Sequence, residues 1–132
     1  MMRRDTYRGM EEATLKAVSM EDFTKMTSSR NRRTLLRLKL NPKLKRFIED
    51  VKKTILKNPN KLIKTHMRDA VILPEWIGLK FGVHNGKEFK QVEITFEKVG
   101  KRLGDFSHST SRVLHSGPGV GATRGSKFVP LK

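Results

Sequence analysis

The stretch KFGVHNGKEFKQVEITF, residues Lys80–Phe96, decides the fold class, because two strand-like runs in it flank an Asn-Gly pair. Asn85 and Gly86 are the residue types that best tolerate the positive backbone angles of a tight hairpin turn. Two runs joined by such a turn can pair with each other as antiparallel strands. The sequence therefore predicts a β-hairpin in the second half of the chain.

The second run of this hairpin has one apolar face. Val92, Ile94 and Phe96 alternate with polar residues, which is the pattern of a strand that buries one of its sides. Phe89 is apolar too, but it is out of step with this alternation. We therefore expect a β-bulge or a change of face near Lys90.

The segments on both sides of the hairpin also carry structural signals. Upstream, the apolar run Ala70–Leu73 is stopped by Pro74, which favours a short buried strand. Downstream, Thr95 can cap a last short helix, and Gly104 is placed to end that helix in the left-handed conformation. After Phe106 the residues are small, polar and without period, which predicts an extended segment.

The first part of the chain, residues 10–57, has a helical pattern. Ser19 begins a capping-box-like start with Asp22 three residues later. Asn41 followed by Pro42 is a typical cap and first-turn pair that opens a further helix. The apolar residues of that helix recur at a spacing that places them on one face: Leu44, Phe47, Ile48, Val51 and Ile55.

Positive charge dominates the chain. There are 29 Lys and Arg residues against 13 Asp and Glu, a formal net charge of +16 over 132 residues. Nucleic acid is the usual partner at this charge density, and an anionic membrane surface is the lesser candidate. Between Arg30 and Lys57, basic residues greatly outnumber the two acids, Glu49 and Asp50. A solvated helix face is one interpretation of this run, but its one-sided charge favours contact with phosphates.

Residues suited to catalysis or metal binding are missing or badly spaced. Cysteine is absent, which excludes disulfides, cysteine zinc sites and thiol nucleophiles. The four histidines lack a metal-ligand spacing, and Asp105, Ser107 and His108 lie too close in sequence to converge as a hydrolase triad. We expect no enzyme activity, metal or cofactor.

No apolar run approaches the roughly 20 residues of a membrane span, and no apolar signal core is present, which suggests an intracellular protein.

The chain ends in the glycine-rich stretch HSGPGVGATRGSKFVPLK, residues His115–Lys132. Its glycine spacing fits neither a dinucleotide fingerprint nor a Walker loop, and no helix can follow it to hold a phosphate. A disordered tail is one interpretation. Scattered apolar residues, among them Val120 and Phe128, instead favour a tail that docks on a partner, with glycines that allow close backbone approach.

A longer motif points to one family. Residues 85–109 read N-G-K-x6-I-x4-V-G-x2-L-G-D-F-x2-S, which resembles the signature of the family of small-subunit ribosomal protein nineteen. The stretch KTHMRDAVILPEWIG, Lys64–Gly78, resembles the segment that precedes this signature in the family. The glycine-rich end and the stretch TYRG, Thr6–Gly9, resemble the tail and the N-terminal extension of eukaryotic and archaeal members.

The resemblance implies an α+β fold with a small sheet of about three strands, flanking helices and extended termini. In these terms residues 1–60 form a basic helical N-terminal extension, residues 61–110 the ribosomal-protein core domain, and residues 111–132 an extended tail. The implied function is that of a structural constituent of the head of the small ribosomal subunit, which binds small-subunit ribosomal RNA and lies next to neighbouring head proteins. The tail of such members reaches toward the decoding site, near aminoacyl-site transfer RNA and messenger RNA. The implied location is cytoplasmic ribosomes, with nucleolar assembly in a eukaryote.

The residues in or beside these motifs are the predicted contacts. For RNA binding around the domain they are Lys64, Arg68, Asn85, Gly86, Lys87, Lys101, Arg102 and Arg112. For the decoding-site tail they are Arg124, Lys127 and Lys132. Trp76 could stack on a base, although packing beside Pro74 and Ile77 is favoured. The rival function is a free-standing basic DNA- or RNA-binding regulator that uses its helical segments as an arm; a nuclease is disfavoured because paired carboxylates are missing.

Overall fold

The structure is a computed structural model that describes residues 6–113 of the chain. The helices are α1 (Glu12–Ala17), α2 (Met20–Met26), α3 (Ser29–Leu36) and α4 (Pro42–Lys57), and the strands are β1 (Ile63–Thr65), β2 (Lys80–His84) and β3 (Phe89–Glu93). Short 3₁₀ turns lie at Leu38–Leu40, Pro74–Trp76, Phe96–Lys98 and Leu103–Phe106. The fold is α+β with a three-stranded sheet, as the family resemblance implied.

The three strands lie side by side in the order β1-β2-β3. β1 is parallel to β2, whereas β2 and β3 form the antiparallel hairpin that the Asn-Gly pair predicted. The register of the hairpin is continuous, from the pair His84–Phe89 at the tip to Lys80–Glu93 at the base. Of the two expectations for the region near Lys90, a bulge or a change of face, the bulge is therefore wrong. Phe89 is out of step with Val92 simply because it leaves the sheet on the opposite face.

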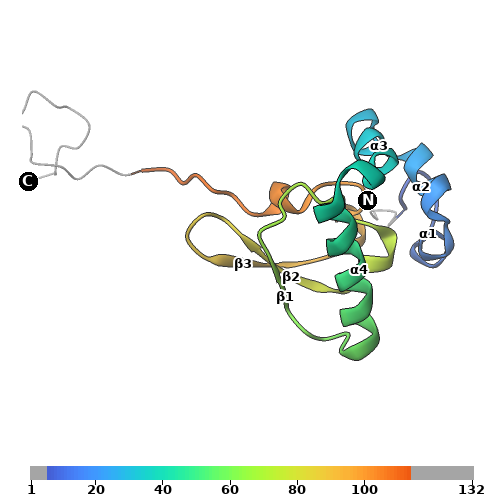
Figure 1. Ribbon diagram of the computed structural model, residues 1–132. Helices are drawn as coiled ribbons and strands as arrows, with labels where there is room; N and C mark the ends of the chain where they lie inside the picture. The colour runs from blue at the N-terminus through green and yellow to red at the C-terminus, as the bar shows by residue number, and fades with distance from the viewer. Residues whose placement is uncertain (1–5, 114–132) are drawn as a thin grey trace, which may run out of the picture.

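One face of the sheet, here called the inner face, is packed against α4 (Figure 1). Phe81 of β2 is fully buried there, and its ring centroid lies 6.3 Å from that of Phe47 on α4 and 5.2 Å from that of Trp76. Phe47 and Trp76 meet edge to face at 5.8 Å, a favourable aromatic geometry. The packing interpretation of Trp76 is thus confirmed, because its side chain has no exposed area.

The predicted helix starts are also present. The side chain of Asn41 accepts the backbone N–H of Leu44 at 3.2 Å, and Pro42 is the first residue of α4. At α2, the hydroxyl of Ser19 accepts the N–H of Asp22 at 3.2 Å and donates to its carboxylate at 2.9 Å. The hydrogen bond from Ser19 and the neighbouring Lys25 lower the pKa of the Asp22 carboxyl, because both favour its charged form.

Two predicted elements are wrong. The run Ala70–Leu73 is buried as expected, but it is no strand of the sheet; it contacts the irregular segment Gly100–Leu103, with one isolated bridge between Val71 and Arg102. The helix expected after Thr95 is two separate 3₁₀ turns, and the side chain of Thr95 makes no capping hydrogen bond. The glycine with a positive φ in this region is Gly100, at +77°, which redirects the chain between the two turns.

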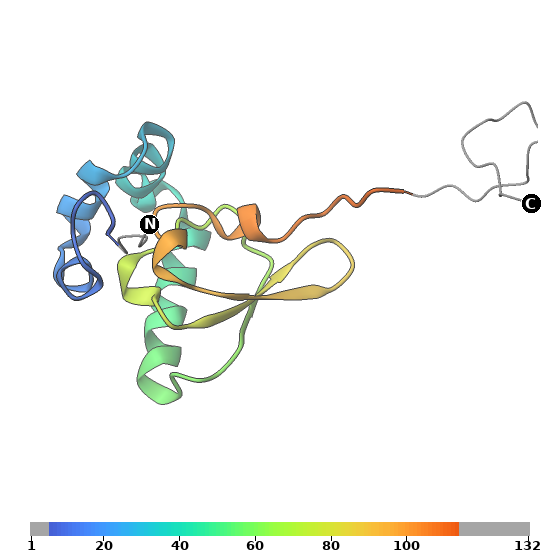
Figure 2. The same cartoon turned by 180° about the vertical axis from the view of Figure 1, so that it is seen from behind.

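Hydrophobic residues from both halves of the chain share one core cluster, which extends from Leu15 on α1 to Leu103. Helices α1–α3 gather at one end of the molecule (Figure 1). The tip of the hairpin and the extended segment that ends at Val113 project from the opposite end, which is clear in both views (Figures 1 and 2).

If α4 unfolds together with the sheet, shortening a side chain on the buried face of α4 must lower the free energy of unfolding. We expect Leu44→Ala, at a site that is 2% exposed, to lower the free energy of unfolding by about 2–5 kcal/mol. The matched change Leu56→Ala, at a site that is 87% exposed on the same helix, should change it by less than about 0.5 kcal/mol. Urea unfolding followed by Trp76 fluorescence measures both, and equal effects would contradict the packing of α4 on the sheet.

Candidate nucleic-acid interface

The tip of the hairpin is a four-residue loop rather than a two-residue turn. The side-chain oxygen of Asn85 accepts the backbone N–H groups of Lys87 and Glu88 at 2.9 and 2.8 Å, so Asn85 holds the loop from within. Gly86 has a φ of +101°, and its N–H donates to Nδ1 of His84 at 3.0 Å. The loop is therefore built by its own side chains, and it leaves the side chain of Lys87 exposed at the tip.

Arg68, a predicted RNA contact, is tied into the fold. Its guanidinium donates to the carbonyl oxygens of His84 at 2.7 Å, Gly104 at 3.2 Å and Ser107. Gly104 packs so closely on Arg68 that an added Cβ would lie 3.0 Å from Arg68 Cβ. Arg68 thus joins the end of β2 to the start of the extended C-terminal segment, and its contact with RNA stays a prediction.

Arg102 is held in the same manner at the other end of the domain. Its Nε donates to Asn31 at 2.9 Å, and its Nη2 donates to Thr34 at 2.9 Å, both on α3. Its Nη1 donates to the carbonyl oxygen of Asp69 at 3.2 Å. Asn31 in turn donates to the carbonyl oxygen of Gly100 at 2.7 Å. This network fastens α3 to the domain, and no local pattern in the sequence marks Asn31 for this role.

The remaining predicted contacts differ from these two arginines in exposure. Lys64, Lys101 and Arg112 are all exposed, Lys64 on β1 and Arg112 on the extended segment. The ammonium of Lys101 lies 5.9 Å from the ring centroid of Phe106. Lys64 is thus exposed on the sheet, and Lys101 and Arg112 are exposed on the segment that follows β3. The predicted tail contacts Arg124, Lys127 and Lys132 lie outside the described residues.

The basic residues from α3 to the end of α4 form a second cationic surface, here called the α3–α4 surface. All of them are exposed: Arg30, Arg32, Arg33, Arg37, Lys39, Lys43, Lys45, Arg46, Lys52, Lys53 and Lys57. Exposure of the whole set is what a surface for phosphates requires. Two of the eleven approach acids, Lys52 at 3.6 Å from Glu75 and Lys53 at 3.7 Å from Asp50.

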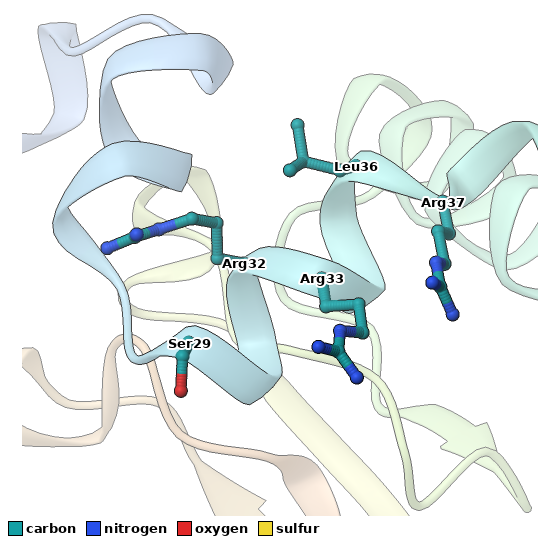
Figure 3. Close-up of a pocket in the computed structure, with 5 residues that line it drawn as sticks. All are labelled: Ser29, Arg32, Arg33, Leu36 and Arg37. Atoms are coloured by element: carbon teal, nitrogen blue, oxygen red, sulfur yellow. The ribbon is translucent and has the colours of Figure 1, made fainter.

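A shallow pocket of about 330 Å³ lies on α3 within this surface. Figure 3 shows Arg32 extended toward the end of α2, where it donates to the carbonyl oxygens of Lys25 at 2.9 Å and Thr27 at 3.2 Å. Arg33 lies on α3 and Arg37 is the residue that directly follows the helix, and both line the pocket (Figure 3). Three arginines thus line the pocket together with Ser29 and Leu36, and one of the arginines, Arg32, is anchored to α2.

The outer face of the sheet, opposite α4, carries a cluster of aromatic rings that the sequence analysis did not predict. Lys64 and His66 leave this face from β1 and the residue after it, and His84 and Phe89 leave it from the hairpin. The three rings of His66, His84 and Phe89 touch one another, with centroids 4.5–5.1 Å apart. The signal that could have revealed this cluster was Phe89, the apolar residue out of step.

Residues 6–113 were predicted to hold no metal site and no membrane span. In that part of the chain no three His, Asp or Glu side chains gather closely enough to hold a metal ion. None of the helices described there is long and apolar enough to cross a membrane. The described surface does carry exposed positive charge and exposed aromatic rings.

The held and the exposed arginines should respond differently to the same conservative change. Arg102→Lys keeps the charge but loses the guanidinium fork that reaches Asn31, Thr34 and Asp69, and we expect it to lower the free energy of unfolding by about 1.5–3 kcal/mol. Arg112→Lys, on the exposed segment, should change it by less than about 0.5 kcal/mol. Chemical denaturation of the two variants checks this; a neutral Arg102→Lys would argue against the network.

Comparison with known proteins gives one consistent result. Residues 36–115 match the family of ribosomal protein S19. The chain is 44% identical over 130 residues to small ribosomal subunit protein uS19 of Methanococcus maripaludis strain C7, an alignment that covers 96% of this chain and 80% of the relative. The uS19 proteins of strains C5 and S2 are each 43% identical with the same coverage. On the strength of this match over most of its length, the chain belongs to the ribosomal protein S19 family.

Proposed function

We propose that the protein is a structural constituent of the small ribosomal subunit that binds small-subunit ribosomal RNA and performs no chemical step. The observation that carries this proposal is the α3–α4 surface, whose eleven cationic side chains are all exposed, in a chain that belongs to a ribosomal protein family. A cationic surface of this extent gains affinity by releasing the counterions of the RNA it covers. The relatives bear the name of a small-subunit protein, which agrees with this role.

The two kinds of basic residue have different tasks in this proposal. Arg68 and Arg102 hold the fold, because each donates hydrogen bonds to three partners within the chain. Lys64, Lys87 and Arg112 are exposed and reach phosphates, while Asn85 and Gly86 shape the loop that presents Lys87. Lys101, also exposed, joins the second group. Recognition then rests on the shape and backbone of the RNA.

Position within the subunit belongs to the same proposal. The protein would lie in the head next to neighbouring head proteins, in ribosomes of the cytoplasm. The tail with Arg124, Lys127 and Lys132 would reach the decoding site, near aminoacyl-site transfer RNA and messenger RNA. In support, the described segment up to Val113 leads away from the body at the end that carries the hairpin tip (Figure 1). The rival function, a free-standing basic regulator, makes a different prediction about sedimentation.

Sedimentation of a cell lysate separates these two functions. We expect the tagged protein to run with small-subunit particles in stoichiometric amount and to stay there at high salt. A regulator would remain in light fractions or leave the particles at moderate salt. That second outcome would contradict the proposal. A chain truncated after Ser116 then tests the tail, because it should still enter the particles but impair decoding.

Phosphate contacts are tested by the salt dependence of RNA binding. Each phosphate contact adds roughly 0.7–0.9 to the slope of log K against log salt concentration. We expect Lys87→Gln to reduce the slope by about that amount and to weaken binding uniformly across RNA sequences. The control is Lys16→Gln on α1, whose ammonium is paired with Glu12 at 2.7 Å, and it should leave the slope unchanged. A slope that Lys87→Gln does not alter would remove Lys87 from the interface.

A further inference from the structure

The outer face of the sheet exposes aromatic rings where a sheet usually buries them or replaces them with polar side chains. In the part of the chain that the structure describes, α4 covers the inner face and no helix covers the outer one (Figures 1 and 2). His66 is exposed, His84 is half-buried, and Phe89 is 37% exposed. Because these rings add little to the core, their clustering calls for another explanation.

Two of the three rings, His66 and His84, form a tilted stack, and the third, Phe89, lies at its edge. The rings of His66 and His84 lie 4.5 Å apart with an angle of 34° between their planes. Phe89 meets both of them edge to face, at 75° and 73°. Phe89 therefore borders the histidine pair and fixes its position, while His66, the exposed member, is the ring on which a further flat group can lie.

Hydrogen bonds and packing hold this cluster in place. Nδ1 of His84 accepts the N–H of Gly86, so the neutral ring carries its proton on Nε2, where it can donate to a ligand. Gly82 lies beneath the cluster, and an added Cβ there would be 3.3 Å from Lys64 Cγ and 3.5 Å from Phe89 Cβ. The missing side chain lets Lys64 and Phe89 close over the strand. The rings of His84 and Phe89 are thus set by the backbone of the hairpin, and His66 reaches them from the end of β1.

Charge identifies the kind of flat group that fits. The ammonium of Lys64 lies 5.5 Å from the ring centroid of Phe89, on the same face as the histidines. Lys87 is exposed at the tip of the same hairpin. A flat, π-bearing group with anionic attachments complements this arrangement, and a nucleotide in a single-stranded RNA segment has both parts.

We propose that an unpaired nucleobase of the bound RNA stacks on His66 and extends the His66–His84 stack, with its flanking phosphate near Lys64. This proposal rests on the proposed function, since it names the part of the RNA that the outer face takes. It adds to the phosphate contacts a contact whose strength comes from stacking. Such a contact depends little on salt, whereas a phosphate contact depends on it strongly.

The test measures binding of the full chain to an in vitro transcript of the small-subunit ribosomal RNA of Methanococcus maripaludis, over a range of salt concentrations. We expect His66→Ala to weaken binding about ten- to a hundredfold without changing the salt slope. His66→Phe, which restores a ring, should recover most of the affinity. Phe89→Leu, which removes the bordering ring, should weaken binding as well. The matched control is His108→Ala, an exposed histidine outside the cluster, which should bind normally.

The outcomes separate this proposal from the proposed function. If the wild-type chain fails to bind the transcript, RNA binding itself is refuted. If the wild-type chain binds but His66→Ala binds equally well, the stacking site is refuted and RNA binding stands. An unchanged RNA affinity together with loss of a neighbouring protein from particles assembled with His66→Ala would assign the cluster to a protein partner and also refute the stacking site.

Discussion

The packing of α4 on one face of a three-stranded sheet is the constraint on which the rest of the structure depends. Phe47, Trp76 and Phe81 meet at this contact, one from the helix, one from the connection before β2 and one from the sheet. A sheet of three short strands is not stable in water unless another layer packs on one of its faces. By covering the inner face, α4 leaves the outer face and the hairpin tip free for other contacts, while its own polar side presents lysines to solvent.

Two arginines and many lysines show how one chain uses positive charge in two ways. The planar fork of Arg68 or Arg102 donates to three oxygen atoms from different segments in a fixed geometry, which the compact ammonium of a lysine does not provide. The hydrogen bonds of each arginine therefore hold together segments of the chain that do not pair with each other in a helix or a sheet. Lysines such as Lys64 and Lys87 stay in water, where their flexible stems suit an irregular polyanion. Hydrogen bonding within the chain, more than position in a motif, separates the two roles, because exposed arginines such as Arg112 belong with the lysines.

Much of the fold could be predicted from the sequence because its signals are local. The Asn85-Gly86 pair, the cap at Asn41 and the apolar face of α4 each depend on residues within a few positions of one another. The segment after Thr95 could not be predicted in this way, because its path is decided by backbone pairing with Ala70–Leu73. The partners of Arg102 were equally out of reach, since Asn31 and Thr34 lie far away in sequence. Likewise, the sequence does not tell on which face of the sheet Phe89 lies. That position follows from the strand register, in which Phe89 pairs with His84.

The parallel pairing of β1 with β2 has a consequence for the order in which the chain folds. The hairpin of β2 and β3 closes a short loop and can form early, because its strands are neighbours in sequence. β1 must wait, because a parallel partner is reached only by a crossover connection, here one that contains the buried run Ala70–Leu73 and Trp76. Closing that connection costs conformational entropy, and this cost comes before the hydrogen bonds between β1 and β2 can stabilise the sheet. We therefore expect β2 and β3 to pair first and β1 to join the sheet afterwards, when α4 packs on it.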